Sequence, residues 1–261
     1  MKALILAGGF GTRLAEETVV RPKPMVEIGG RPILWHIMRH YSEYGINEFV
    51  ICLGYKSEFI KKFFLDYAVS LSDFTVSTGD GTVKVLKERA EDWKVTLLDT
   101  GHSTMTGGRI KRAINFLELD ETFLLTYGDG LSNVNIRRSI DFHKSHKKLA
   151  TVTAVTPPGR FGVLDMNNHG KIDGFREKIA SDQYKINGGF FVLEPEIVNY
   201  IEGDDTVWEN APLERLAADG EFMGYEHNGF WQPMDTIRDR QLLEKLWETG
   251  NPPWRKSYDQ A

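Results

Sequence analysis

The segment from Leu4 to Met25 reads LILAGGFGTRLAEETVVRPKPM, an apolar run and a glycine-rich turn with three cationic side chains, Arg13, Arg21 and Lys23. Glycines lack a Cβ, so their backbone N–H groups can approach phosphate oxygens closely. The prolines on either side of Lys23 exclude an ordinary helix interior, which predicts an extended stretch that folds this lysine back over the loop. The pattern predicts a phosphate-binding loop. A plain turn with solvated basic residues explains the glycines but not the combination.

Two standard phosphate motifs are missing from this loop. The chain has no Gly-Lys-Ser or Gly-Lys-Thr ending, as a P-loop requires, and Leu14 stands where the dinucleotide fingerprint needs its third glycine. A nicotinamide dehydrogenase is therefore disfavoured.

Two aspartates are candidates for metal chemistry. Asp129 follows a strand-like run within Tyr-Gly-Asp-Gly, and Asp235 lies in Phe-Trp-Gln-Pro-Met-Asp-Thr. Each has an ordinary alternative: Asp129 as a turn former and Asp235 as the cap of the last helix. If both reach the phosphate loop, they form a site with few carboxylates, which suits Mg²⁺ shared with substrate phosphates.

The elements that must position these residues alternate over the first 155 positions. Strands are predicted at 2–7, 48–53, 94–98, 122–127 and 149–155, with helices at 33–41, 59–67, 107–117 and 136–146 between them. Repeated strand–helix units predict a parallel sheet covered on both faces, and ligands bind beyond the carboxyl ends of such strands. The phosphate loop and Asp129 both follow strands, so we expect them at one edge.

The pattern changes at two inserted hairpins, 73–89 around Gly-Asp-Gly and 161–175 around Asn-Asn-His-Gly. The second half of the chain adds a strand at 186–193, helices at 195–201 and 208–218, a strand at 222–226 and a final helix at 236–247. We expect one α/β domain over 1–261, with a regular half at about 1–155 and a more elaborate half at about 156–250.

Composition limits the class of protein. The 32 basic and 37 acidic residues are dispersed and give a net charge of -5, which argues against a nucleic-acid partner. No apolar run is long enough to span a membrane and no signal-peptide pattern opens the chain, so we expect a cytoplasmic protein. The only cysteine, Cys52, lies in an apolar run and is expected in the core.

Seven ordered blocks make a resemblance specific: LILAGGFGTRL, RPKPMVEIGGRPILWHIM, VTLLDTGHSTMTGGR, YGDG, TPPGRFGVLD, INGGFFVLEP and FWQPMDT. In these blocks the chain resembles the sugar-phosphate nucleotidyltransferases, and within them the branch that joins CTP and glucose 1-phosphate to give CDP-glucose and pyrophosphate. The resemblance implies a three-layer Rossmann-like fold with a central mixed, mostly parallel sheet, with a nucleotide-binding half at about 1–155 and a sugar-phosphate-binding half at about 156–250. It also implies a product that feeds dideoxyhexose or related sugars for cell-surface polysaccharide.

The resemblance also implies residue roles. Asp129 and Asp235 match the Mg²⁺ ligands, and Arg13 and Lys23 join them as catalytic residues. The nucleotide site takes in Leu6, Ala7, Gly8, Gly9, Phe10, Gly11, Thr12, Arg13, Lys23, Thr104, Arg109 and Gly128. The sugar-phosphate site takes in Glu177, Lys178, Asn187 and Gly188. A solvated strand-end lysine is the alternative for Lys178, and Trp208 and Trp231 either border the sugar pocket or pack in the core.

Two other functions stay open at this stage. One is the same chemistry with dTTP or UTP, because base choice depends on a few contacts; the block TMTGGR favours cytidine. The other is a non-catalytic sugar-nucleotide sensor, which would not need to keep Arg13, Lys23 and both aspartates. Family habit predicts a homo-oligomer, with the 73–89 hairpin as a candidate contact.

Overall fold

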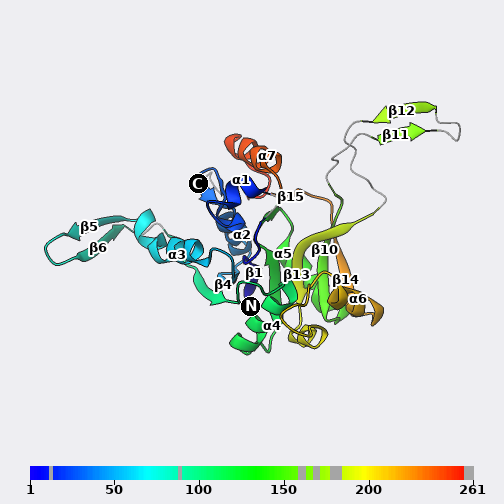
Figure 1. Cartoon of the computed structure of the whole chain (residues 1–261), viewed down its shortest axis with the longest axis horizontal. Coiled ribbons are helices and arrows are strands. Elements are labelled where there is room, and N and C mark those ends of the chain that lie inside the picture. The colour runs from blue at the N-terminus through cyan, green and yellow to red at the C-terminus, as the bar shows by residue number, and fades with distance from the viewer. Residues whose placement is uncertain (12–13, 88–89, 158–162, 167–170, 177–183, 256–261) are drawn as a thin grey trace.

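A seven-stranded sheet forms the centre of the computed structural model (Figure 1), which describes residues 1–11, 14–87, 90–157, 163–166, 171–176 and 184–255. The strand order is β14 (Phe222–His227), β10 (Ala150–Val155), β13 (Ile186–Leu193), β8 (Phe123–Tyr127), β1 (Ala3–Leu6), β4 (Glu48–Leu53) and β7 (Lys94–Asp99). Neighbours are parallel except at β13, which is antiparallel to both β10 and β8. The expected mixed, mostly parallel sheet is confirmed.

Helices cover both faces of this sheet because its strands are apolar on both sides. In β1, Ala3 and Ile5 face one core while Leu4 and Leu6 face the other. Side chains of α2 (Ile33–Ser42), α3 (Ser57–Leu71), α5 (Ile136–His146) and α7 (Ile237–Glu248) fill the first core. Those of α4 (Thr106–Leu117), α6 (Ala211–Ala218) and the 3-10 helix η3 (Pro195–Tyr200) fill the second. The three-layer arrangement is therefore confirmed, and Cys52 is buried within it.

Both predicted hairpins are present and project from opposite sides of the body (Figure 1). The first pairs β5 (Asp73–Ser77) with β6 (Thr82–Lys87), and the second pairs β11 (Val163–Met166) with β12 (Ile172–Arg176). The predicted Asn-Asn-His-Gly turn of the second hairpin lies outside the described residues.

Two short two-stranded ribbons were not predicted from the sequence, and one of them brings Asp129 close to Asp235. The first joins β2 (Glu27–Ile28) to β3 (Arg31–Pro32). The second joins β9 (Gly130–Ser132) to β15 (Trp231–Pro233), with Gly130 opposite Pro233. The Met234 N–H extends this ribbon by donating to the Asp129 carbonyl at 2.8 Å. Segments about one hundred residues apart in the chain are thereby held side by side.

Two predicted helices differ from the structure. The segment 195–201 is a 3-10 helix, with Pro195 in its first turn and an extended Ile201 at its end, rather than an α-helix. The segment 208–218 becomes helical only at Ala211, because Pro212 has no N–H to donate and fits only the first turn of a helix. Residues 208–210 consequently form a loop that runs toward α4.

Candidate active site

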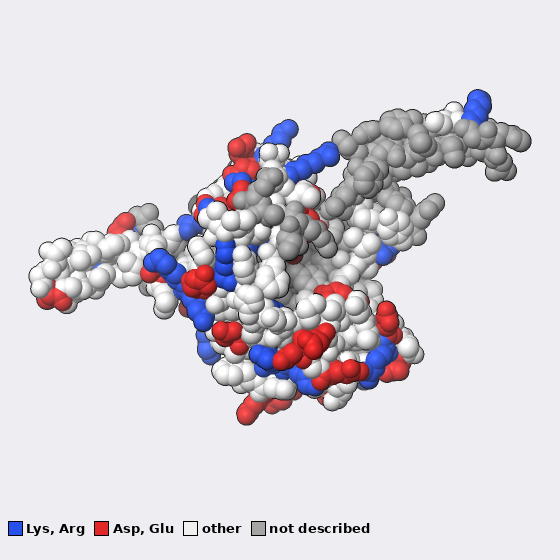
Figure 2. All heavy atoms as spheres, viewed as in Figure 1, with Lys and Arg blue, Asp and Glu red and all other residues white. Residues whose placement is uncertain are grey.

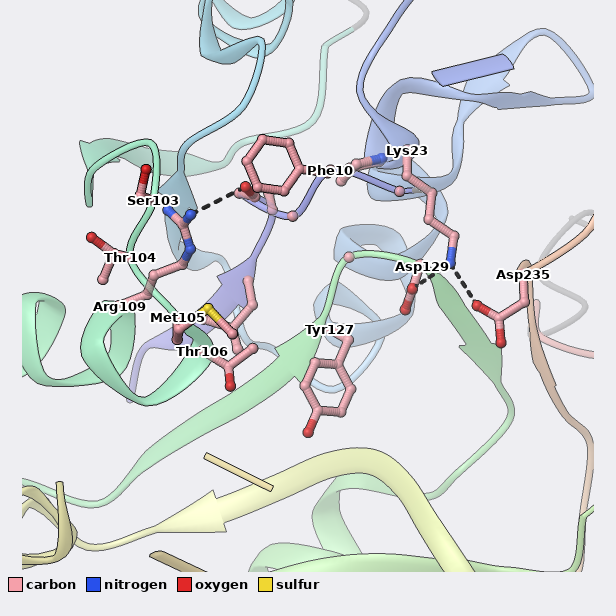
Figure 3. Close-up of a pocket in the computed structure, with 17 residues that line it drawn as sticks. Phe10, Lys23, Ser103, Thr104, Met105, Thr106, Arg109, Tyr127, Asp129 and Asp235 are labelled. Carbon is pink, nitrogen blue, oxygen red and sulfur yellow. Dashed lines mark hydrogen bonds and ion pairs between the residues drawn. The ribbon is translucent and has the colours of Figure 1, made fainter. Parts of the chain in front are cut away.

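A cavity of about 390 Å³ opens beyond the carboxyl ends of β1 and β8, beside the first turn of α4 (Figure 3). Its lining is Leu6, Ala7, Gly8, Gly9, Phe10, Gly11, Lys23, Pro24, Ser103, Thr104, Met105, Thr106, Arg109, Tyr127, Gly128, Asp129 and Asp235. Most residues proposed from sequence for the nucleotide site are thus brought together. Thr12 and Arg13, proposed for the triphosphate, lie outside the described residues.

The glycines of the loop after β1 have different local reasons. A Cβ at Gly8 would lie 2.3 Å from the Arg109 guanidinium, so this position has room only for glycine. Gly11 adopts a φ of +64°, which favours glycine, and a Cβ there would lie 3.2 Å from Cβ of Lys23. A Cβ at Gly9 would meet no atom within 4 Å. The loop is therefore tightly held at Gly8 and Gly11 and open toward the cavity at Gly9.

Arg109 holds this end of the sheet together. Its buried guanidinium donates to Leu53 O (2.7 Å), Thr100 Oγ1 (2.8 Å), Gly101 O (2.8 Å), Gly8 O (3.1 Å) and His102 O (3.3 Å). These acceptors come from the ends of β1 and β4 and from the loop after β7. Burial lowers the pKa of Arg109, although nearby acidic groups oppose the shift. Arg109 therefore braces the glycine loop as well as lining the cavity.

Lys23 lies between the two candidate metal ligands (Figure 3). Its Nζ donates to Asp129 Oδ2 and to Asp235 Oδ1, each at 2.7 Å. Burial acts to lower the pKa of Lys23, but the charges and hydrogen bonds of Asp129 and Asp235 outweigh it and the pKa is raised. Lys23 is thus held as a cation, on a 3-10 turn (η2, Lys23–Met25) that follows the extended Pro22. Arg21 instead pairs with Glu27 at 2.9 Å.

Asp235 is not the cap of the last helix, contrary to one prediction. Thr236 caps α7 and forms a capping box with Asp239. Asp239 Oδ2 also accepts the Asp235 backbone N–H at 3.1 Å. The cap therefore fixes the backbone of Asp235 and leaves its side chain directed at Lys23.

Two of the residues predicted for the sugar phosphate, Asn187 and Gly188, lie on β13, which pairs with β8. Asn187 Nδ2 donates to the Tyr127 hydroxyl at 3.4 Å, and the Gly188 carbonyl accepts Trp231 Nε1–H at 2.7 Å. A Cβ at Gly188 would lie 2.8 Å from the Thr153 carbonyl, so close packing against β10 explains this glycine. Glu177 and Lys178 lie outside the described residues. Trp208 is fully buried in the core, so its packing role is the correct one.

Sequence reasoning missed three polar residues of the cavity, Ser103, Thr106 and Tyr127, and also Glu209, the shared partner of the last two. Tyr127 and Thr106 line the cavity, and both donate to the carboxylate of Glu209, at 2.5 Å and 2.7 Å respectively. Both had a usable signal in the sequence: Tyr127 ends a predicted strand, and Thr106 lies in the block TMTGGR. No local pattern singles out Glu209 in the loop before α6.

Residues 2–219 match the family model described as Nucleotidyl transferase. The chain is 56% identical over 255 residues to a glucose-1-phosphate cytidylyltransferase of Salmonella typhimurium, covering 98% of this chain and 99% of that one. It is 46% identical over 256 residues to a probable glucose-1-phosphate cytidylyltransferase of Bacillus subtilis, with 98% and 99% covered.

Solved structures share the fold at lower identity. HddC from Yersinia pseudotuberculosis, crystallised with GMP-PN, superposes with a TM-score of 0.68 at 23% identity, over 94% of this chain and 99% of that one. A putative glucose-1-phosphate thymidylyltransferase from Bacillus anthracis gives 0.66 at 18%, with 94% of each chain covered. Among the helices that the structure describes, none is long and apolar enough to cross a membrane.

Proposed function

Because the chain belongs to the nucleotidyl transferase family, we propose that it converts CTP and glucose 1-phosphate to CDP-glucose and pyrophosphate. The observation that carries the proposal is the cation Lys23 held between Asp129 and Asp235 at the rim of the glycine-loop cavity. The two carboxylates would hold a divalent cation beside a bound triphosphate, and Lys23 would add a further positive charge. We expect the enzyme to act in the cytoplasm, where nucleoside triphosphates are available.

In this reaction an oxygen of the sugar phosphate attacks the α-phosphorus of CTP, and the bond from that phosphorus to the pyrophosphate oxygen breaks. Negative charge grows on the departing pyrophosphate. Lys23, and Arg13 from the same loop, would stabilise that charge, while the backbone N–H groups of the glycine loop orient the triphosphate. No protein nucleophile is needed, because the sugar phosphate attacks directly. A general base is not obligatory either, because a phosphate monoester is already largely ionised near neutral pH.

The two carboxylates fit a divalent cation. Asp129 and Asp235 already surround one positive group, the Lys23 ammonium, with oxygens that lie within twice 2.7 Å of each other. Among the described residues no set of three or more His, Cys, Asp or Glu side chains could hold a metal, so substrate phosphates would have to supply further oxygens. That donor set suits Mg²⁺, which would add charge stabilisation at the reacting phosphates when bound.

The remaining roles are proposed from the sequence motifs and, for the described residues, from their place in or beside the cavity. We propose that Leu6 to Gly11, with Thr12 and Arg13, contact the nucleotide, and that Thr104, Arg109 and Gly128 lie at its nucleoside end. For the sugar phosphate we propose Glu177, Lys178, Asn187 and Gly188, contributed by the second half of the chain.

Pyrophosphate release tests the proposal directly. Glucose 1-phosphate and Mg²⁺ are incubated in parallel with CTP, UTP, dTTP, ATP or GTP, and preference for CTP is expected. Preference for UTP or dTTP would support the alternative base with the same chemistry. Absence of turnover with every nucleotide would contradict the enzyme and favour a sensor. Asp129→Ala and Asp235→Ala should each abolish turnover in a folded protein.

We further propose that the enzyme is a homo-oligomer and that the β5–β6 hairpin contacts a second copy. Phe74 pairs with Val85 and Val76 with Val83, so these four exposed apolar side chains share one face. The projecting arm is largely uncharged in the view of Figure 2. An isolated two-stranded hairpin is only marginally stable in water, so this face favours a partner.

The oligomer is tested by measuring mass in solution. The double variant Val83→Lys with Val85→Lys should lower the molar mass found by light scattering, because it places two charges on the apolar face. Thr75→Lys, on the opposite face of the same hairpin, is the matched control and should keep the wild-type mass. If the double variant also keeps it, the hairpin is not the contact.

A further inference from the structure

Glu209 joins the two sides of the cavity. Its Oε2 accepts the Thr106 hydroxyl at 2.7 Å, at the first turn of α4, and its Oε1 accepts the Tyr127 hydroxyl at 2.5 Å, at the end of β8. Both hydroxyls point the same way in Figure 3, away from Phe10. An ionised carboxylate has only acceptor sites, so each hydroxyl must give its proton to Glu209.

The hydroxyl protons of Thr106 and Tyr127 are thus both used in hydrogen bonds to Glu209. Thr106 Oγ1 additionally accepts the backbone N–H of Trp208 at 2.9 Å, which places it in a directed chain that ends on Glu209. Tyr127 can then offer a ligand only the lone pairs of its hydroxyl oxygen.

Asn187 presents a hydrogen-bond donor beside the Tyr127 hydroxyl oxygen, which is an acceptor. Its Oδ1 accepts the Gly189 backbone N–H at 2.8 Å, so its Nδ2 must be the atom that faces Tyr127, at 3.4 Å. Gly189, with a φ of +79°, packs against the Tyr127 ring so closely that a Cβ there would lie 2.6 Å from Cδ2. Both the amide and the ring are therefore fixed in orientation.

We propose that Glu209 is a positioning residue that makes Tyr127 an acceptor beside the donor Asn187, so that the two recognise one hydroxyl of the sugar phosphate. A hydroxyl oxygen at an ordinary hydrogen-bond distance of about 2.8 Å from each atom completes a triangle on the 3.4 Å base. That hydroxyl accepts from Asn187 and donates to Tyr127. The inference rests on the proposed function only for the identity of the substrate as a sugar phosphate.

The consequence is selectivity for a hydroxyl group at one position of the sugar. A deoxy analogue leaves the Tyr127 acceptor and the Asn187 donor without the ligand contacts that the hydroxyl would supply. The loss of an uncharged hydrogen-bonded group typically lowers kcat/KM by about tenfold. Without Glu209, the Tyr127 hydroxyl is free to rotate and no longer holds a fixed acceptor toward the ligand, so this discrimination should weaken.

The test compares glucose 1-phosphate with its 2-, 3-, 4- and 6-deoxy analogues at saturating CTP, in the wild type, Glu209→Ala, Glu209→Gln and Tyr127→Phe. We expect one analogue to lose about tenfold in kcat/KM with the wild type and only about twofold with Glu209→Ala or Tyr127→Phe. Glu209→Gln keeps an oxygen that accepts from Tyr127 and should retain the discrimination. Glu214→Gln, on the exposed side of α6, is the matched control.

A second readout separates positioning from a general structural effect. The KM for glucose 1-phosphate should rise in Glu209→Ala while the KM for CTP stays within about twofold, and melting curves should confirm folded protein. The inference is overturned if Glu209→Ala and Tyr127→Phe keep the wild-type discrimination, or if the two KM values rise together. If the wild type does not turn over glucose 1-phosphate, the proposed function fails and the inference falls with it.

Discussion

Replacing Lys23 with methionine should destabilise the metal-free protein by a predictable amount. The Lys23 side chain is 10% exposed and its partners Asp129 and Asp235 are 33% and 18% exposed. Removing one partner of a buried ion pair costs about 3–5 kcal/mol, because the other charge is left uncompensated. Water screens part of the charge of Asp129, so we expect about 2–3 kcal/mol. For a chain of this size that corresponds to a fall in Tm of roughly 4–10 °C.

Mg²⁺ should then restore what Lys23→Met removes. In the wild type an added cation competes with the ammonium group for the same two carboxylates, whereas in the variant it meets no competitor there. A ligand at one hundred times its Kd stabilises a folded protein by about 2.7 kcal/mol. Mg²⁺ without nucleotide should therefore raise the Tm of the variant more than that of the wild type. The kcat/KM of the variant should still fall by about 10²–10³, since the leaving pyrophosphate loses a positive charge.

The assay is a thermal melt over a Mg²⁺ titration at low ionic strength, with Lys62→Met as the control. Lys62 also donates to a carboxylate at 2.7 Å, that of Asp66, but is 80% exposed, so its loss should leave both the Tm and the Mg²⁺ response unchanged. A Lys23→Met protein with the Tm and the Mg²⁺ response of the wild type would refute the reasoning about both the ion pair and the metal site.

Three further predictions concern the residues that support the site. Asp239→Ala removes the acceptor of the Asp235 N–H and should lower kcat/KM by about tenfold while raising the Mg²⁺ concentration needed for half-maximal turnover. Arg109→Met leaves buried carbonyls without donors, so unfolding in urea should show a loss of about 2–4 kcal/mol, and the KM for CTP should rise. Burial lowers the pKa of His36 to about 4, so only the unfolded chain binds its proton at first as the pH falls from 6.5. The stability from neutral His36 is complete above pH 6.5 and declines by about 3 kcal/mol by pH 4, a decline that urea titrations should find reduced in His36→Phe.

Periodicity predicted the sheet because each strand carries its own evidence. All four residues of β1, Ala-Leu-Ile-Leu, are apolar, and this run alone predicts a strand that is buried on both faces. The 195–201 segment has the apolar spacing of an α-helix. Because it is short and begins with Pro195, it forms a 3-10 helix instead. The antiparallel direction of β13 also has no local signature, because strand direction is set by the connections around it.

The acidic pair shows where local reasoning stops. Sequence marked Asp129 and Asp235 separately, each with an ordinary alternative as turn former or cap. What brings them to one lysine is the pairing of β9 with β15, three residues on each strand, too short for a period-two pattern to stand out. The cap alternative for Asp235 was decided by Thr236 one position later, whose hydroxyl accepts the Asp239 N–H at 3.2 Å. The sequence offers no prediction of any kind for Glu209, because its role depends on partners from two other elements.

The site cannot be divided between the two halves of the chain. The glycine loop, Lys23 and Asp129 come from the first 155 residues, but Asp235 lies beyond them and is one of the two carboxylates that hold the lysine. Glu209, also from the second half, accepts from the α4 residue Thr106 on the proposed nucleotide side. β13 additionally supplies hydrogen bonds to β8 from the second half. Residues 1–155 alone would therefore keep the phosphate loop but lose a carboxylate beside Lys23, the fixed proton of Tyr127 and a neighbour of the central sheet. The proposed nucleotide and sugar sites therefore both need residues from the two halves of the chain.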